Sequence, residues 1–392
     1  MSLFPTSGIR GNVKPKPSRM ALYACGFNPH GQLLPNSSGE PPQDLYTLIK
    51  IAEGDSIRVR CAFWSSTVLE IDGVLIYRGS HAFKLSVCCE IEGPPASDIK
   101  SFFGDASGVL GALTNGGVIL TLHAHSKGLV LNKHPHCTFL YLRGLVVDHI
   151  AIAGNDQVCL ATHKSDHTDD DRQKIASSAQ VYMLHIFPDI KEFLSSSGPT
   201  YDYRIENAHT SLLASNTSFA ALNTTGEVEA FGDPRHCPYG RSPVPVPSLG
   251  GIPIAKVATG GWITAALSRD KDLYVFGGRP GEEKRMKCLP MLNSGEDVSL
   301  VDLEGEVDVR DVGVGAGHVV ALTEKGTVWG VGENGTGQLG MGGETVEERK
   351  ERAFQEDWVR LGGDEVWGKD KVVGVEAKDW GTFVLVERRD GG

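Results

Sequence analysis

Apolar positions in the C-terminal part of the chain gather in short runs separated by glycine-rich turns. Within residues 315–343, the run Val319-Val320-Ala321-Leu322 is followed by a Glu-Lys-Gly turn and a second run over 327–331. A dense glycine loop over 332–340 closes the unit. Because glycine enters positive φ without steric cost, two such runs around a tight turn predict a β-hairpin. One hairpin cannot bury its own apolar faces, so a stable fold requires that this unit recur along the chain.

The spacing of this unit recurs along the chain. Leu322 is followed four positions later by the turn residue Gly326, and six positions beyond that by the closing residue Gly332. Other positions keep all or the first half of this spacing: Leu69, Gly73 and Gly79; Leu222, Gly226 and Gly232; Leu267, Lys271 and Gly277; and Leu113 with Gly117. Three tryptophans, Trp64, Trp262 and Trp380, each stand five residues before a strand-ending leucine. Agreement at so many positions predicts a repeat protein.

Seven units can be counted. Residues 146–184 hold a weaker copy, residues 372–387 supply a first half, and residues 20–33 supply a second half. Four residues near the N-terminus, Gly26, Gly31, Gln32 and Leu33, match four in the last full unit, Gly332, Gly337, Gln338 and Leu339, and Gly340 belongs to the same glycine loop. We therefore predict an all-β fold, a seven-bladed β-propeller of four-stranded blades. One blade is closed by the N- and C-terminal segments, which removes the exposed sheet edges.

This count sets the expected domain organisation. We expect a flexible leader over 1–19, a single propeller domain over 20–388 and a tail over 389–392. Blade segments are predicted near 57–80, 99–122, 146–184, 208–232, 254–277 and 309–332, with the closing blade from 372–387 and 20–33. Residues 34–48 are interpreted as a connection and residues 49–61 as strand. Inserts are expected at 163–179, 278–300 and 343–358, the last with helix-forming content.

The chain resembles the RCC1-like family (RCC1/BLIP-II type) of seven-bladed β-propellers. Four stretches carry the resemblance: GENGTGQLGMG at 332–342, CGFNPHGQL at 25–33, and the hairpin ends VFGG at 275–278 and AFGD at 230–233. His318 keeps a histidine that commonly follows the first-strand glycine in this family, whereas Ser65, Ile263 and Gly381 replace it. The chain is thus similar to a divergent member.

The resemblance implies a non-enzymatic scaffold that docks a protein partner. The near-minimal size, terminal half-blades and degenerate repeats look like a branch of small fungal propellers. That branch partners a small zinc-binding protein in tRNA wobble-uridine modification and diphthamide synthesis. The alternatives implied by the family are a guanine-nucleotide exchange factor for a Ran-like small GTPase and a chromatin-associated module.

Charge and cysteine usage narrow these alternatives. The net charge is −11, and no run of Lys or Arg exceeds the Lys-Pro-Lys at 14–16, which speaks against direct nucleic-acid binding. The eight cysteines include no C-x-x-C pair, so we interpret them as reduced core residues. The first twenty residues lack the apolar region of a signal peptide, and no stretch is long enough to cross a bilayer. We expect a monomer in the cytoplasm, the nucleus or both.

No catalytic arrangement emerges, and no cofactor is expected. Residues 330–335 satisfy G-x-G-x-x-G, but a dinucleotide site needs a helix after the glycines, so we interpret them as blade-turn residues. Histidine pairs at 123/125, 134/136 and 163/167 have spacings that a metal could use, although exposed hairpin or loop histidines are commoner. We predict no metal site.

Two groups of residues are candidates for partner binding. The first is the tryptophan set Trp64, Trp262 and Trp380, because equivalent blade positions come out at equivalent places around the axis. Packing between neighbouring blades is the interpretation we favour for these side chains, and anchors for a partner are the alternative. The second group is Asp169, Asp170 and Asp171, in the acidic insert at 163–179.

Overall fold

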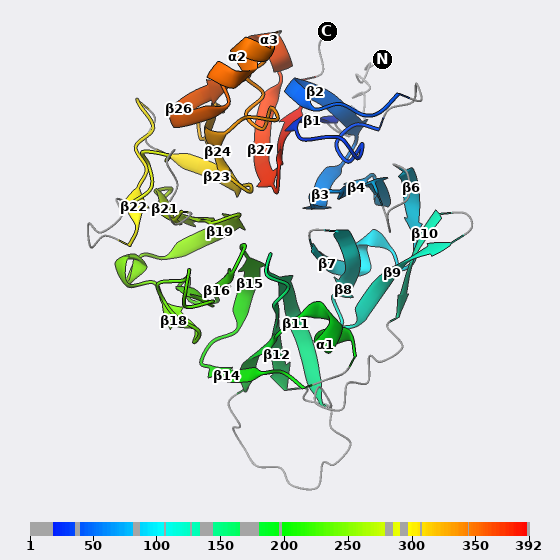
Figure 1. Cartoon of the computed structure of the whole chain (residues 1–392), viewed down its shortest axis with the longest axis vertical. Coiled ribbons are helices and arrows are strands. Elements are labelled where there is room, and N and C mark those ends of the chain that lie inside the picture. The colour runs from blue at the N-terminus through cyan, green and yellow to red at the C-terminus, as the bar shows by residue number, and fades with distance from the viewer. Residues whose placement is uncertain are drawn as a thin grey trace, which may run out of the picture.

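The strands are arranged as radial sheets around one axis, and the two ends of the chain meet in one sheet (Figure 1). The fold comes from a computed structural model. It describes residues 19–35, 40–80, 87–105, 107–125, 128–133, 144–164, 180–195, 198–278, 285–290, 297–305, 308–343 and 345–389.

Among the described residues, the strands form five four-stranded sheets and one eight-stranded sheet. The eight-stranded sheet is two blades joined by parallel pairing of their outer strands, so the blades number seven, as predicted. From the axis outward, the closing blade consists of β27 (Lys371–Lys378), β28 (Gly381–Glu387), β1 (Met20–Gly26) and β2 (Leu45–Gly54). Blade 1 consists of β3 (Ile57–Ala62), β4 (Ser66–Ile71), β5 (Val74–Gly79) and β6 (Val87–Glu92), blade 2 of β7 (Ile99–Asp105), β8 (Gly108–Thr114), β9 (Ile119–His125) and β10 (Gly128–Lys133), and blade 3 of β11 (Leu145–Ile152), β12 (Val158–Lys164), β13 (Tyr182–Phe187) and β14 (Tyr201–Ile205). Blade 4 consists of β15 (His209–Ala214), β16 (Ser218–Asn223), β17 (Val228–Gly232) and β18 (Val244–Pro245), blade 5 of β19 (Ile254–Gly260), β20 (Ile263–Ser268), β21 (Leu273–Gly277) and β22 (Ser299–Leu300), and blade 6 of β23 (Val309–Val314), β24 (His318–Thr323), β25 (Val328–Glu333) and β26 (Phe354–Leu361).

Helical segments are short and lie in connections. In the described part of the chain they are η1 (Ala96–Asp98), α1 (Ile190–Leu194), η3 (Pro247–Leu249), α2 (Val346–Glu351) and α3 (Asp364–Trp367). Helix α2 lies in the segment 343–358, where the sequence predicted helical content. Thr345 and Glu348 form a capping box at its start, which satisfies backbone donors that a helix leaves free.

The closing blade joins the first and last strands of the chain. Strand β1 pairs with β28 in antiparallel register from Met20 opposite Glu387 to Gly26 opposite Gly381. The strand region predicted over 49–61 is divided between two blades, because β2 ends the closing blade at Gly54 and β3 begins blade 1 at Ile57. The chain turns between them against Asp72, whose carboxylate accepts a hydrogen bond from the Ser56 amide at 2.8 Å. Strand β2 also begins inside the predicted connection over 34–48.

Every inner strand carries a β-bulge in its pairing with the second strand, although in blade 1 the bulge lies two residue pairs closer to the turn than in the other blades. The bulged residues are Arg60, Lys100, Asp148, Thr210, Ala255, Arg310 and Val373. A bulge bends its strand, increases the local twist and redirects a side chain. The seven inner strands therefore share one distortion, which the sequence spacing did not reveal.

The closing glycine of the repeat has a steric cause. In five blades this residue has positive φ, and an added Cβ would lie 2.1–2.5 Å from a carbonyl oxygen of the turn between the first and second strands. The residues are Gly26, Gly79, Gly232, Gly277 and Gly332. The amide after each glycine donates a hydrogen bond to that same carbonyl, at 2.7–3.0 Å. Any side chain would break this junction, so the glycine holds the third strand against the turn.

The core lies between blades rather than in one centre. One buried cluster combines Val320 and Leu322 of blade 6 with Val375 and Val384 of the closing blade. The cluster on the other side of the closing blade includes Leu22, Phe383 and Leu69. Since each sheet buries its faces on its two neighbours, closure of the ring by β1 and β28 completes the burial of apolar surface.

Candidate partner-binding rim

One face of the ring collects the turns between first and second strands together with the connections between third and fourth strands. We call this face the tryptophan rim, because Trp64, Trp262 and Trp380 all lie in its turns. The turns between second and third strands, such as Asp72-Gly73, lie on the opposite face, as antiparallel pairing requires.

The three tryptophans are not equivalent, contrary to the predicted register. The carbonyl oxygens of Trp262 and Trp380 accept hydrogen bonds from the residues after the closing glycines, Gly278 and Phe27. In blade 1 this role falls to the carbonyl of Ser65, so Trp64 lies one position earlier in its turn. The cause is the two-residue hairpin loop at Asp72-Gly73, since Ile71 pairs directly with Val74 and the blade's second turn is shortened.

Two of the three tryptophans are exposed and come from neighbouring blades. Trp64 is 45% exposed and Trp380 is 40% exposed. Both line a small cleft that also includes Phe27 and Lys378. The Phe27 ring stacks on Trp64 with centroids 6.0 Å apart, and the His30 ring meets Trp64 edge-on at 5.7 Å. Trp64 thus packs against the neighbouring closing blade, yet both Trp64 and Trp380 keep a large exposed fraction, which packing between blades alone does not explain.

Trp262 stands apart from this cluster. It is half-buried and contacts the His236 ring edge-on, with centroids 5.2 Å apart. The turn of blade 6, with Gly315 and Gly317, stands between it and the closing blade. The aromatic surface is therefore a local patch over the closing blade and blade 1, not a ring. We call Phe27, His30, Trp64 and Trp380 the aromatic patch.

The backbone of Trp64 is fixed by side chains of the closing blade. The Gln32 amide Nε2 donates to the carbonyl oxygens of both Trp64 and Phe27, each at 2.9 Å. The Trp64 amide donates to the Asp379 carboxylate, and burial raises the pKa of Asp379 to about 6 despite this bond. Both polar groups of the Trp64 backbone thus depend on the neighbouring blade, which makes the aromatic patch rigid.

In both loops that contain the Gly-Gln-Leu motif, an asparagine and the glutamine hold the loop together through hydrogen bonds to backbone amides. Asn28 Oδ1 accepts from the Leu33 amide at 2.9 Å, and Asn334 Oδ1 accepts from the Leu339 amide at 2.8 Å. In each loop the glutamine, four residues after the asparagine, accepts through Oε1 from a backbone amide, at 3.1 Å for Gln32 and 2.9 Å for Gln338. Sequence reasoning missed the asparagines, although the shared Asn-to-Gln spacing was visible.

The other predicted candidates do not join the aromatic patch. Asp169, Asp170 and Asp171 lie outside the described residues, as do His134, His136 and His167. The three aspartates follow strand β12 in the sequence, and β12 ends at Lys164 on the face opposite the tryptophan rim. His163 Nδ1 lies 2.6 Å from Asp148 Oδ2, and His123 Nε2 lies 2.7 Å from Thr121 Oγ1. No group of three or more metal-ligating side chains occurs among the described residues.

Blade 3 contains a Thr–His–Asp arrangement that needs a separate account. His185 Nε2 lies 2.8 Å from Thr162 Oγ1, and His185 Nδ1 lies 2.6 Å from Asp202 Oδ1. Nucleophilic catalysis would require the hydroxyl to meet a substrate. Thr162 is 1% exposed, so its hydroxyl is closed to substrate, and we interpret the three residues as a structural bridge between strands.

Comparisons with known proteins agree with this architecture. The family model of the regulator of chromosome condensation (RCC1) repeat matches residues 309–338. Over 96% of the chain, the fold matches 93% of Prp20p from Saccharomyces cerevisiae with a TM-score of 0.58 at 12% identity; that protein has been studied for its binding to Gsp1p and histones. The chain therefore has the fold of an RCC1-type β-propeller and carries a recognisable RCC1 repeat over residues 309–338.

Two sequence relatives support the same assignment. The mitochondrial RCC1 domain-containing protein RUG3 of Arabidopsis thaliana is 31% identical over 145 residues, which cover 33% of this chain and 31% of that protein. Protein RCC1 of Candida albicans is 29% identical over 167 residues, covering 39% of this chain and 34% of the relative. The matches span about a third of these relatives. The RCC1-like fold supports a protein-interaction module. Among the described residues, none of the helices has the length and apolar character needed to span a membrane.

Proposed function

We propose that this RCC1-like propeller is a non-enzymatic scaffold that docks a protein partner on the tryptophan rim, with Trp64 and Trp380 as anchors. The observation that carries the proposal is their exposure, 45% and 40%, on turns whose backbone is held by hydrogen bonds: from Gln32 and to Asp379 for Trp64, and from the Phe27 amide for Trp380. Large aromatic side chains on a rigid surface contribute much of the binding energy at protein interfaces. A rigid anchor also loses little conformational entropy on binding.

For the partner, we propose a small zinc-binding protein that acts in tRNA wobble-uridine modification and diphthamide synthesis. This assignment is supported by the resemblance of the sequence to small fungal propellers of this kind. An exposed aromatic and acidic patch would favour this scaffold and a basic rim would favour the alternatives; the aromatic part of that patch is present on the tryptophan rim. We propose residence in the cytoplasm, the nucleus or both.

The alternative is nucleotide exchange on a Ran-like small GTPase. It is supported by the fold shared with Prp20p, which has been studied for its binding to Gsp1p. Sequence identity of 12% carries the fold but not the interface. Exchange would require a loop of the propeller to enter the nucleotide site of the GTPase. Such a GTPase would therefore bind best after its nucleotide is removed, a condition that the zinc-protein proposal does not require.

Affinity purification of the tagged chain from its own cells, followed by mass spectrometry, separates these proposals. Wild type is compared with the Trp64→Ser/Trp380→Ser double variant and with Leu300→Ser, which removes a 62% exposed apolar side chain from the outer strand β22. Recovery of a small zinc protein by wild type and Leu300→Ser, but not by the tryptophan variant, is the expected result. Recovery of a Ran-like GTPase instead, above all after nucleotide removal, would overturn the zinc-protein assignment.

A further inference from the structure

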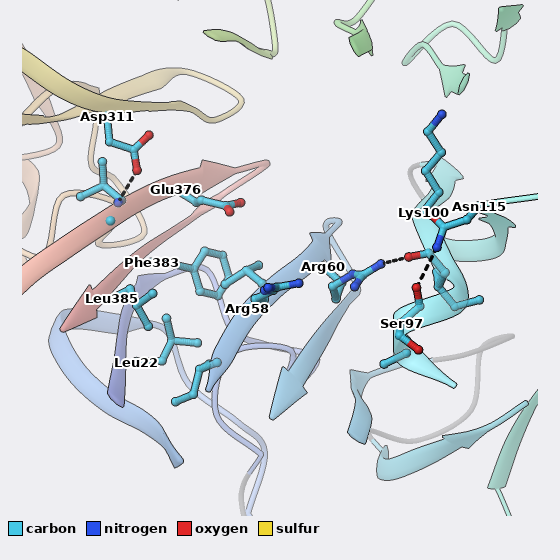
Figure 2. Close-up of a pocket in the computed structure, with 16 residues that line it drawn as sticks. Leu22, Arg58, Arg60, Ser97, Lys100, Asn115, Asp311, Glu376, Phe383 and Leu385 are labelled. Carbon is cyan, nitrogen blue, oxygen red and sulfur yellow. Dashed lines mark hydrogen bonds between the residues drawn. The ribbon is translucent and has the colours of Figure 1, made fainter. Parts of the chain in front are cut away.

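The face opposite the tryptophan rim holds a cavity of about 570 Å³ near the axis. It is bounded by the inner strands of the closing blade, blade 1 and blade 2, close to where β3 and β7 begin (Figure 2). Pockets for small organic ligands have volumes of roughly 300–1,000 Å³. The cavity lies away from the aromatic patch, so a ligand here would act separately from the proposed partner.

Basic side chains concentrate in this cavity, although the chain has a net charge of −11. We call it the basic cavity, after Arg58, Arg60 and Lys100. Arg60 is held in place, since its guanidinium bonds to Glu70 at 2.7 Å and to the carbonyl of Ile99. Arg58 and Lys100 are exposed and have no ion-pair partner in the described part of the chain.

The two acidic side chains of the basic cavity, Asp311 and Glu376, differ in whether they already have a partner. Asp311 is occupied, because its carboxylate accepts from Lys256 Nζ at 2.6 Å and from the Val375 amide at 3.0 Å. Glu376 has no ion-pair partner among the described residues. Counting Arg58, Lys100 and Glu376 as the available charges leaves one net positive charge before any ligand binds.

The walls of the basic cavity differ in polarity. Figure 2 shows Arg58 next to Phe383 and Leu385 on one side, and Arg60 next to Lys100 and Asn115 on the other. The Lys100 side chain extends away from Arg58, so it would have to turn toward Arg58 for both cations to contact one ligand. Asn115 Nδ2 donates to the carbonyl of Ser97 at 2.7 Å, which fixes the polar side. A ligand that satisfies both walls has an anionic group and an apolar group.

We propose that the basic cavity binds a small organic phosphate, with its phosphate contacting Arg58 and Lys100 and its apolar group packing near Phe383 and Leu385. A phosphate monoester carries about −1.5 to −2 charges at neutral pH, which matches two unpaired cations better than a single carboxylate does. Arginine also presents paired donors that fit phosphate oxygens.

The test is isothermal titration of the full chain with phenyl phosphate and, separately, with inorganic phosphate. Saturable binding is expected for phenyl phosphate, with at least tenfold weaker binding for inorganic phosphate, because the latter lacks the apolar group. The Arg58→Gln/Lys100→Gln variant should bind phenyl phosphate at least tenfold more weakly. Arg204→Gln/Lys369→Gln changes the net charge equally, removes exposed cations outside the cavity and should bind as wild type does.

A further variant tests the basic cavity through a gain of affinity, which a misfolded protein would not show. Glu376→Gln removes the available acid and should strengthen phenyl phosphate binding two- to threefold. Absence of saturable binding by wild type would overturn the proposal, as would equal losses in the two double variants. Equal affinities for phenyl phosphate and inorganic phosphate would overturn the role of the apolar wall.

Discussion

The Gln32 side chain, from the loop after β1, donates a 2.9 Å hydrogen bond to the carbonyl oxygen of Trp64 on the neighbouring blade. The same Nε2 donates to the carbonyl of Phe27, whose ring stacks on the Trp64 indole. One buried amide thus ties the closing of the ring to the placement of its exposed aromatic surface.

Replacing Gln32 with alanine should loosen the aromatic patch and destabilise the ring. Gln32 is 3% exposed, so its loss leaves two carbonyl oxygens without their donor at a buried site. We expect the free energy of unfolding to fall by about 3 kcal/mol, because the His30 amide also loses its bond to Gln32 Oε1 and each of the three hydrogen bonds contributes about 1 kcal/mol. Urea unfolding followed by tryptophan fluorescence measures this. Gln43→Ala, an exposed change in the same loop, should have no effect, and equal stability of the two variants would contradict the account.

Alanine at Gly79 and at Gly73 should have unequal costs. Both glycines have positive φ, 117° and 81°, so each alanine carries backbone strain of about 1–2 kcal/mol. At Gly73 an added Cβ meets nothing within 4 Å, whereas at Gly79 it would lie 2.1 Å from the Ser65 carbonyl oxygen. We expect Gly79→Ala to lose about 3 kcal/mol or more, and Gly73→Ala only the strain term. Thermal unfolding of both variants checks this, and similar losses would exclude the steric explanation of the closing glycine.

Asp379 should make stability fall as the pH rises from about 4 to about 6. Burial raises its folded pKa to about 6, above the unfolded value, so its contribution is fully present below the unfolded pKa and is lost as pH rises through the folded one. Asp379→Asn keeps an oxygen acceptor for the Trp64 amide and tolerates the local φ of 47°. The stability difference between variant and wild type should grow across this pH range by roughly 2–3 kcal/mol. A difference that stays constant from pH 4 to 7 would refute the shift.

The repeat spacing was enough to predict the blades because it reports local chemistry. The glycine turn and the closing glycine each meet a steric condition that recurs in the same form, so Leu322, Gly326 and Gly332 repeat at other blades. Outer strands do not obey such a condition. Strands β18 and β22 have two residues each, and their pairing depends on neighbours far along the chain, so their positions were not predicted.

The composition of the aromatic patch could not be predicted from the sequence. The indole positions were visible, but a one-residue difference in hairpin length displaced Trp64 from the register of Trp262 and Trp380. Phe27 and His30 join Trp64 only because the chain ends share a blade. Asp379 was missed as well, since its contact with the Trp64 amide is made across two blades.

The most direct test of the scaffold account is the affinity of the purified partner for the chain with and without its exposed tryptophans. Isothermal titration should show the Trp64→Ala/Trp380→Ala variant binding at least about a hundredfold more weakly, from an interface loss of about 3 kcal/mol or more. Trp262→Ala, outside the aromatic patch, should bind within a few fold of wild type. Wild-type affinity in the folded double variant would contradict docking on the tryptophan rim.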